Sequence, residues 1–165
     1  MNCSRFGRIT MIYDVIKLQY FGKEVYLHFR DRITMVRGDS GTGKSLIFQI
    51  LRPLKVSEQY RNIECLNYES MSLLETQDEV LKQLEKYKNK LVVIDNAELL
   101  LNKSSRTFIA NDEDNQYVII GRNIEGLGVM KKGFCRVVDE GKTIELQYEY
   151  DDAYFKREPL KIEAF

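Results

Sequence analysis

The strongest constraint on how this chain folds is a set of short apolar runs without a charged residue. They occupy residues 33–36 (ITMV), 91–94 (LVVI) and 117–120 (YVII). A strand that alternates apolar and polar residues can leave one face in water, whereas an uninterrupted run needs cover on both faces. These runs therefore predict buried strands of a parallel central sheet, with helices packed against it.

Helices are expected between the runs. Residues 44–52 precede Pro53, whose ring clashes with a preceding helical turn and ends the helix. Residues 77–89 follow a capping-box sequence and carry apolar side chains at helical spacing. A further helix is expected over residues 97–110, and a strand over residues 63–66.

Both ends of the sequence alternate apolar and polar residues instead. Residues 12–20 and 25–29 alternate on either side of a glycine-containing turn, and residues 134–138 and 143–150 do the same. Each pair predicts an antiparallel hairpin. The sequence therefore predicts an α/β fold with a mostly parallel central sheet and antiparallel hairpins at its N- and C-terminal ends. No linker is visible, so we expect residues 1–165 to form a single domain.

Composition excludes several classes of protein. Hydrophobic residues make up 44% and charged residues 30% of the 165 residues, which is typical of a soluble globular chain. No apolar stretch approaches the length of a membrane helix, and the first residues lack the apolar core of a secretion signal. The 3 cysteines contain no CxxC pair. We therefore expect a cytoplasmic protein without a membrane partner, a disulfide framework or a zinc site.

A glycine-rich segment connects the run at 33–36 to the helix at 44–52. It reads Gly38, Asp39, Ser40, Gly41, Thr42, Gly43, Lys44, Ser45. The three glycines let the backbone curl so that successive N–H groups point at phosphate oxygens, and the helix start adds its positive dipole end. This is the GxxxxGK[ST] pattern, in which Lys44 reaches the β- and γ-phosphates and the Ser45 hydroxyl ligates Mg²⁺.

The run at 91–94 ends in Asp95, which gives the Walker B pattern of four apolar residues and an aspartate. A buried strand would deliver this carboxylate to its C-terminal edge, where it would hold Mg²⁺ opposite Ser45. With these two motifs the chain resembles the P-loop NTPases, and is most similar to the branch of RecA-like, AAA+ and ABC-type ATPases. The resemblance implies a three-layer P-loop fold, ATP and Mg²⁺ as cofactors, and Gly38–Ser45 as the phosphate-binding residues.

Departures from that branch bear on hydrolysis. Its members commonly carry a glutamate directly after the Walker B aspartate, whereas this chain has Asn96. Glu98, or a carboxylate near the strand at 63–66, would have to act as the general base. Arg122 follows the run at 117–120, where the family carries a sensor of the γ-phosphate or an intersubunit finger. We therefore expect ATP binding with weak or partner-stimulated hydrolysis.

Two other functions remain open: a small-molecule or nucleotide kinase, in which Arg122 would clamp the transferred phosphoryl group, and a nucleotide-dependent switch without turnover. The guanine-reading NKxD motif of small GTPases is absent. Acidic and basic residues balance at 25 each, so net charge does not indicate nucleic acid, and a protein partner, a DNA partner or an oligomer all stay open. The acidic loop 112–114 lacks the spacing of a calcium loop, and we expect it to be solvated.

Overall fold

A computed structural model describes residues 11–37, 44–67, 73–122 and 124–150, with the backbone alone for residues 44–45 and 73–76. All its strands belong to one eight-stranded sheet of order β1-β2-β8-β7-β3-β6-β5-β4. The strands are β1 (Val15–Tyr20), β2 (Lys23–His28), β3 (Ile33–Val36), β4 (Ile63–Leu66), β5 (Leu91–Ile94), β6 (Gln116–Ile120), β7 (Phe134–Asp139) and β8 (Thr143–Tyr148). The α-helices are α1 (Lys44–Leu51), α2 (Leu73–Lys86), α3 (Ala97–Leu100) and α4 (Lys103–Asn111).

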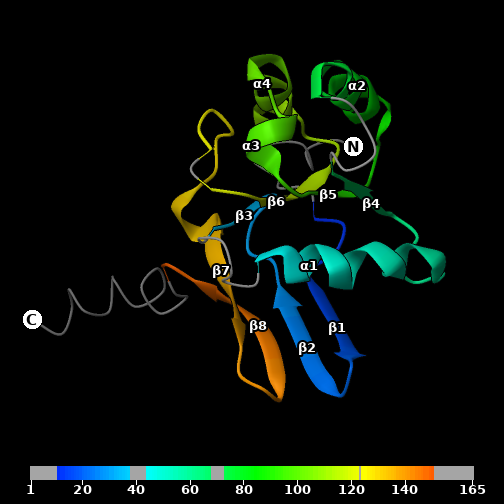
Figure 1. Cartoon of the computed structure of the whole chain (residues 1–165), viewed down its shortest axis with the longest axis vertical. Coiled ribbons are helices and arrows are strands. Elements are labelled where there is room, and N and C mark those ends of the chain that lie inside the picture. Colours follow the sequence, from blue (N-terminus) through cyan, green and yellow to red (C-terminus); the bar gives the residue numbers. More distant parts are fainter. Residues whose placement is uncertain (1–10, 38–43, 68–72, 123, 151–165) are drawn as a thin grey trace, which may run out of the picture.

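The sheet has two differently built halves. Strands β4, β5, β6 and β3 pair in parallel, and three of them, β3, β5 and β6, contain the continuous apolar runs. Strands β1 and β2 form one antiparallel hairpin, and β7 and β8 form another. The halves are joined where β7 pairs in parallel with β3, and the two hairpins are joined by parallel pairing of β2 with β8. Figure 1 shows the hairpins turned away from the plane of β3–β6–β5–β4.

The sheet is thus curled. Helix α1 lies on its inner side, toward which the hairpins turn, and α2, α3 and α4 lie on its outer side (Figure 1). The buried face of α1 (Ile47, Phe48, Ile50 and Leu51) packs in a core that includes residues of β1, β2, β7 and β8. A second core holds the outer helices against the other face of β3, β6 and β5. Because α1 packs against both halves of the sheet, it fixes the place where the chain passes from β3 into this helix.

The predicted three-layer fold with a mostly parallel sheet is wrong. The structure has one mixed sheet curled into a half-barrel, and the described part of the chain has only four α-helices, of 8, 14, 4 and 9 residues. The physical reason is the pairing of β2 with β8, which makes the two hairpins one continuous half of the sheet. That half buries its inner face against α1 and the rest of the sheet, so helical layers are not needed to cover it.

The helix expected over residues 97–110 is divided into α3 and α4. The break falls at Leu101 and Asn102, both of which have extended backbone. The Asn102 side chain accepts a hydrogen bond from the Ser105 N–H at 3.0 Å and so caps α4. The end of α1 at Leu51, before Pro53, agrees with the sequence prediction.

Replacing Gly133 with alanine should lower the free energy of unfolding by about 1–3 kcal/mol, as overpacked sites do. A Cβ at Gly133 would lie 2.5 Å from the Ile33 carbonyl oxygen, a backbone atom of β3 that cannot move away cheaply. Urea denaturation measures the change. Ser104→Ala, at an exposed position of α4, is the control and should leave stability nearly unchanged. Equal stability of the two variants would contradict the tight β3–β7 junction.

Candidate functional site

Three parallel strands end side by side at one edge of the sheet. The register places Val36 of β3 beside Ile120 of β6, and Ile94 of β5 beside Ile119. The Gly121 N–H then donates to the Val36 carbonyl oxygen at 3.2 Å. Because β6 lies between β3 and β5, the ends of those two strands are about 10 Å apart, which is two strand spacings. We call the residues that follow β3, β5 and β6 the carboxyl edge.

Asp95 lies at this edge directly after β5, and it is only 8% exposed. Its N–H donates to the Leu66 carbonyl oxygen at 2.9 Å, which extends the β4–β5 ladder by one residue. Its carboxylate Oδ1 accepts the Asn96 N–H at 2.9 Å. The carboxylate is therefore held close to the end of its own strand rather than extended into solvent.

Asn96 turns the chain from β5 into α3 and so places Glu98. Its backbone is left-handed, with φ 52° and ψ 44°, a conformation that asparagine tolerates better than most residues. In the first turn of α3, the Glu98 carboxylate reaches the end of β6, since a Cβ at Gly121 would lie 2.5 Å from Glu98 Oε1. The absence of a side chain at Gly121 is what allows this approach.

The remaining predicted site residues divide into two groups. Arg122 is exposed and follows Gly121 at the carboxyl edge, so Asp95, Glu98 and Arg122 belong to the same edge. Helix α1 begins at Lys44 on the inner side of the sheet, and the backbone of Lys44 and Ser45 forms its first residues. The segment from Gly38 to Gly43, with Asp39, Ser40, Gly41 and Thr42, lies outside the described residues.

The one candidate metal ligand whose side chain is described, Asp95, is compatible with a magnesium ion that takes its other ligands from water and a bound substrate. Over the residues that the structure describes, no group of three or more histidine, cysteine or acidic side chains gathers in a way that could hold a metal. Magnesium needs no such cage, because it is usually bound through one or two carboxylates together with water and substrate phosphates. The carboxylate of Asp95 at a strand end suits that arrangement.

The two described thiols and the Tyr87 phenol are not activated for nucleophilic chemistry. Burial raises the pKa of the Cys65 thiol to about 12, and Arg52 offsets only part of this. Burial also raises the pKa of the Cys135 thiol and, to about 12, that of the Tyr87 hydroxyl. All three groups stay protonated near neutral pH, so covalent catalysis through them is not favoured.

A cavity of about 470 Å³ lies between the start of α4 and the loop after β6. Lys103, Thr107 and Glu125 contribute to its lining. The Arg106 guanidinium, also in the lining, donates from Nε to the Leu101 carbonyl oxygen at 2.9 Å and from Nη1 to that of Glu125 at 3.4 Å. Arg106 therefore holds the loop after β6 onto α4.

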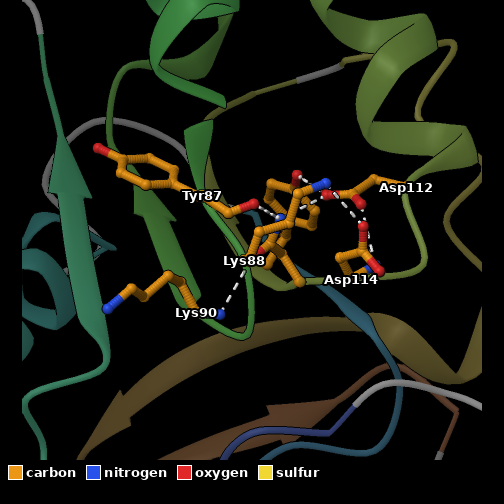
Figure 2. A network of polar contacts seen from close by, with 7 residues as sticks. Tyr87, Lys88, Lys90, Asp112 and Asp114 are labelled. Atoms are coloured by element: carbon orange, nitrogen blue, oxygen red, sulfur yellow. Dashed lines mark hydrogen bonds and ion pairs between the residues drawn. The ribbon is translucent and has the colours of Figure 1, made fainter. Parts of the chain in front are cut away.

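A dense polar network lies at the opposite edge, where β5 and β6 begin (Figure 2). The Asp112 carboxylate is its centre and is 7% exposed. Its Oδ2 accepts from the Tyr117 hydroxyl at 2.5 Å and from Asn115 Nδ2 at 2.7 Å, and its Oδ1 accepts from the Asp114 N–H at 2.9 Å. The expectation that the acidic loop is solvated is therefore wrong for Asp112.

The same network joins the two connections that lead into β5 and β6. Asn115 donates to the Tyr87 carbonyl oxygen at 2.9 Å and accepts from the Lys90 N–H at 3.0 Å. Lys88 and Asp114 add an exposed ion pair of 2.9 Å. Since the Asp112 carboxylate and the Asn115 amide are both used within the protein, this network has a structural role. The sequence did carry a signal for this network, because Asp and Asn residues in a loop between a helix and a strand often form hydrogen bonds to nearby backbone.

No family model, curated protein or solved structure matches this chain. The candidate site therefore stands on the residues and their geometry. Among the helices of the described residues, none is both long and apolar enough to cross a membrane.

Replacing Asp112 with alanine should lower the free energy of unfolding by about 2 kcal/mol or more, because two side-chain donors and one N–H lose their acceptor. Urea denaturation at neutral pH measures this effect. Asp78→Ala, at an exposed position of α2, is the control and should change little. A loss as small as that of the control would show that the network contributes nothing to stability.

Proposed function

We propose that this protein binds Mg²⁺–ATP at the carboxyl edge and hydrolyses it slowly, with turnover stimulated by a partner. The observation that supports this most is the strand order. Strands β3 and β5 flank β6 in parallel, so β3, which precedes the glycine-rich segment in the sequence, and β5, which precedes Asp95, end at the same edge of the sheet. Two strand ends more than 40 residues apart in the sequence thus lie at one edge, which supports a ligand shared by the patterns that follow them.

The roles of the residues follow from their chemistry. The backbone of Gly38–Gly43 and the first residues of α1 would supply N–H donors to the phosphates. Lys44 would neutralise the β- and γ-phosphates, and Ser45 and Asp95 would hold the magnesium ion. When bound, magnesium would supply charge neutralisation on the phosphate oxygens. Asp95 then serves as its carboxylate ligand, and its hydrogen bond to Asn96 orients it.

Hydrolysis needs a group that orients or deprotonates the attacking water. Asn96 carries no carboxylate, so that role would fall to Glu98, whose carboxylate lies beside the end of β6. Glu98 is exposed, so its carboxylate is open to bulk water rather than enclosed in a dry site. Arg122, next to Gly121, would stabilise charge on the transferred phosphoryl group. Together these features support slow basal turnover.

A nucleotide-dependent switch without turnover is the second candidate, and Asn96 favours it. The left-handed turn at Asn96 suits asparagine, and the side chain at this position cannot accept a proton from water. Both candidates need the same binding site. They differ only in whether phosphate is released.

Replacing Lys44 with alanine should weaken Mg²⁺–ATP binding at least about a hundredfold, since charged hydrogen bonds to the phosphates would be lost. Isothermal titration calorimetry measures the affinity. Lys86→Ala, on the exposed face of α2, is the control for loss of one positive charge and should bind like the wild type. Equal affinity of Lys44→Ala and wild type would refute the assignment.

The Glu98→Gln variant should keep its Mg²⁺–ATP affinity within about twofold and lose about a hundredfold of its hydrolysis rate, as removal of a general base does. Wild-type turnover without a partner should lie below about 1 s⁻¹. Release of phosphate from γ-labelled ATP gives the rate, and Glu125→Gln is the matched control at another exposed glutamate. Full activity in Glu98→Gln would exclude its role as base. Transfer of the label to a nucleoside monophosphate would identify a kinase instead.

A further inference from the structure

Arg37, the last described residue before the glycine-rich segment, is held by contacts that cross three adjacent strands. Its N–H donates to the Cys135 carbonyl oxygen of β7 at 2.8 Å, which continues the β3–β7 pairing. Its guanidinium lies over the Phe134 ring, 4.3 Å from the ring centre. Beyond that ring, Nε and Nη2 donate to the two carboxylate oxygens of Glu149 at 2.9 and 2.5 Å.

This ion pair has the geometry in which such pairs contribute most to stability. Two parallel hydrogen bonds fix the planar guanidinium relative to the carboxylate, and the face of the guanidinium packs on the Phe134 ring. The side chains are 37% and 27% exposed, so water screens the pair only in part. A simple surface ion pair would hold its two residues far less firmly.

Glu149 is itself anchored, so the pair connects two fixed points. The Glu149 N–H donates to the Phe134 carbonyl oxygen at 2.9 Å. On one side of it, the Arg30 guanidinium lies over the Tyr148 ring at 4.1 Å, and on the other Arg30 Nη1 donates to the Tyr150 carbonyl oxygen at 2.6 Å. Arg30, in the loop before β3, thus holds the residues on both sides of Glu149 at the end of β8.

We infer that Arg37 and Glu149 are positioning residues for phosphate binding: their ion pair sets the direction in which the chain leaves β3. This inference rests on the proposed function, because it assigns the pair's effect to the ligand of that site. Gly38 follows Arg37 directly in the sequence, so the backbone direction at Arg37 sets the direction in which the glycine-rich segment starts. Because Glu149 neutralises the guanidinium, Arg37 acts through the backbone and not as a phosphate ligand.

The test compares two ion pairs of similar exposure. Glu149→Gln removes the charge opposite Arg37, and Asp139→Asn removes the charge opposite Lys23, a 2.8 Å pair at the far end of the same hairpin. Hydrogen exchange of a peptide spanning residues 38–45 is measured without nucleotide, and Mg²⁺–ATP affinity is measured by calorimetry. The double variant Arg37→Glu/Glu149→Arg restores the pair with its charges exchanged.

Glu149→Gln should speed exchange over residues 38–45 and weaken Mg²⁺–ATP binding about tenfold, while Asp139→Asn does neither. The exchanged pair should recover most of both losses. Equal behaviour of Glu149→Gln and Asp139→Asn would overturn the inference, as would tighter binding in Glu149→Gln or an exchanged pair as weak as Arg37→Glu alone. If wild type and Lys44→Ala both fail to bind Mg²⁺–ATP, the proposed function fails, and the exchange measurement still decides whether the pair positions the segment.

Discussion

Backbone pairing among β3, β6 and β5 is the interaction on which the rest of this structure depends. The apolar side chains of these strands are at most 3% exposed, so each strand needs cover from both sides. Helices α2, α3 and α4 supply it on the outer face, and α1 with the curled hairpins supplies it on the inner face. Because three strands run in the same direction, the residues that follow them meet at one edge. Any ligand chemistry of the chain that uses Asp95 must take place there.

The two edges of these parallel strands differ in what their polar side chains contact. At the edge where β5 and β6 begin, the Asp112 carboxylate and the Asn115 amide are saturated with hydrogen bonds from the protein, which joins two loops firmly. At the carboxyl edge, Asp95 directly follows β5, and the Glu98 carboxylate on α3 reaches the end of the adjacent strand β6, where Gly121 leaves space for it. A cluster whose polar groups bond to one another stabilises the fold, whereas a carboxylate at a strand end is the kind of ligand that magnesium takes together with water and phosphate.

Sequence reasoning succeeded where the signal is local. The run at Leu91–Ile94 and the turn at Gly22 report burial and chain reversal through neighbouring residues, and β5 and the β1–β2 hairpin are observed there. It failed where partners are distant in sequence. Pairing of β2 with β8 joins residues about 120 positions apart, and no periodicity reveals it. The burial of Asp112 likewise depends on Tyr117, a side chain on the next strand, and the division between α3 and α4 on the cap formed by Asn102.

The most direct test is to locate where a nucleotide-bound metal approaches the sheet. Manganese can replace magnesium in the complex with ATP, and its unpaired electrons broaden the NMR signals of nearby amides. Binding at the carboxyl edge predicts selective broadening at Asp95, Asn96 and Gly121, with the signals of Asn115 and Gln116 on the opposite edge much less affected. Broadening centred on Asn115 and Gln116 would contradict binding at the carboxyl edge. Broadening that is no more selective with ATP than without it would contradict this binding as well.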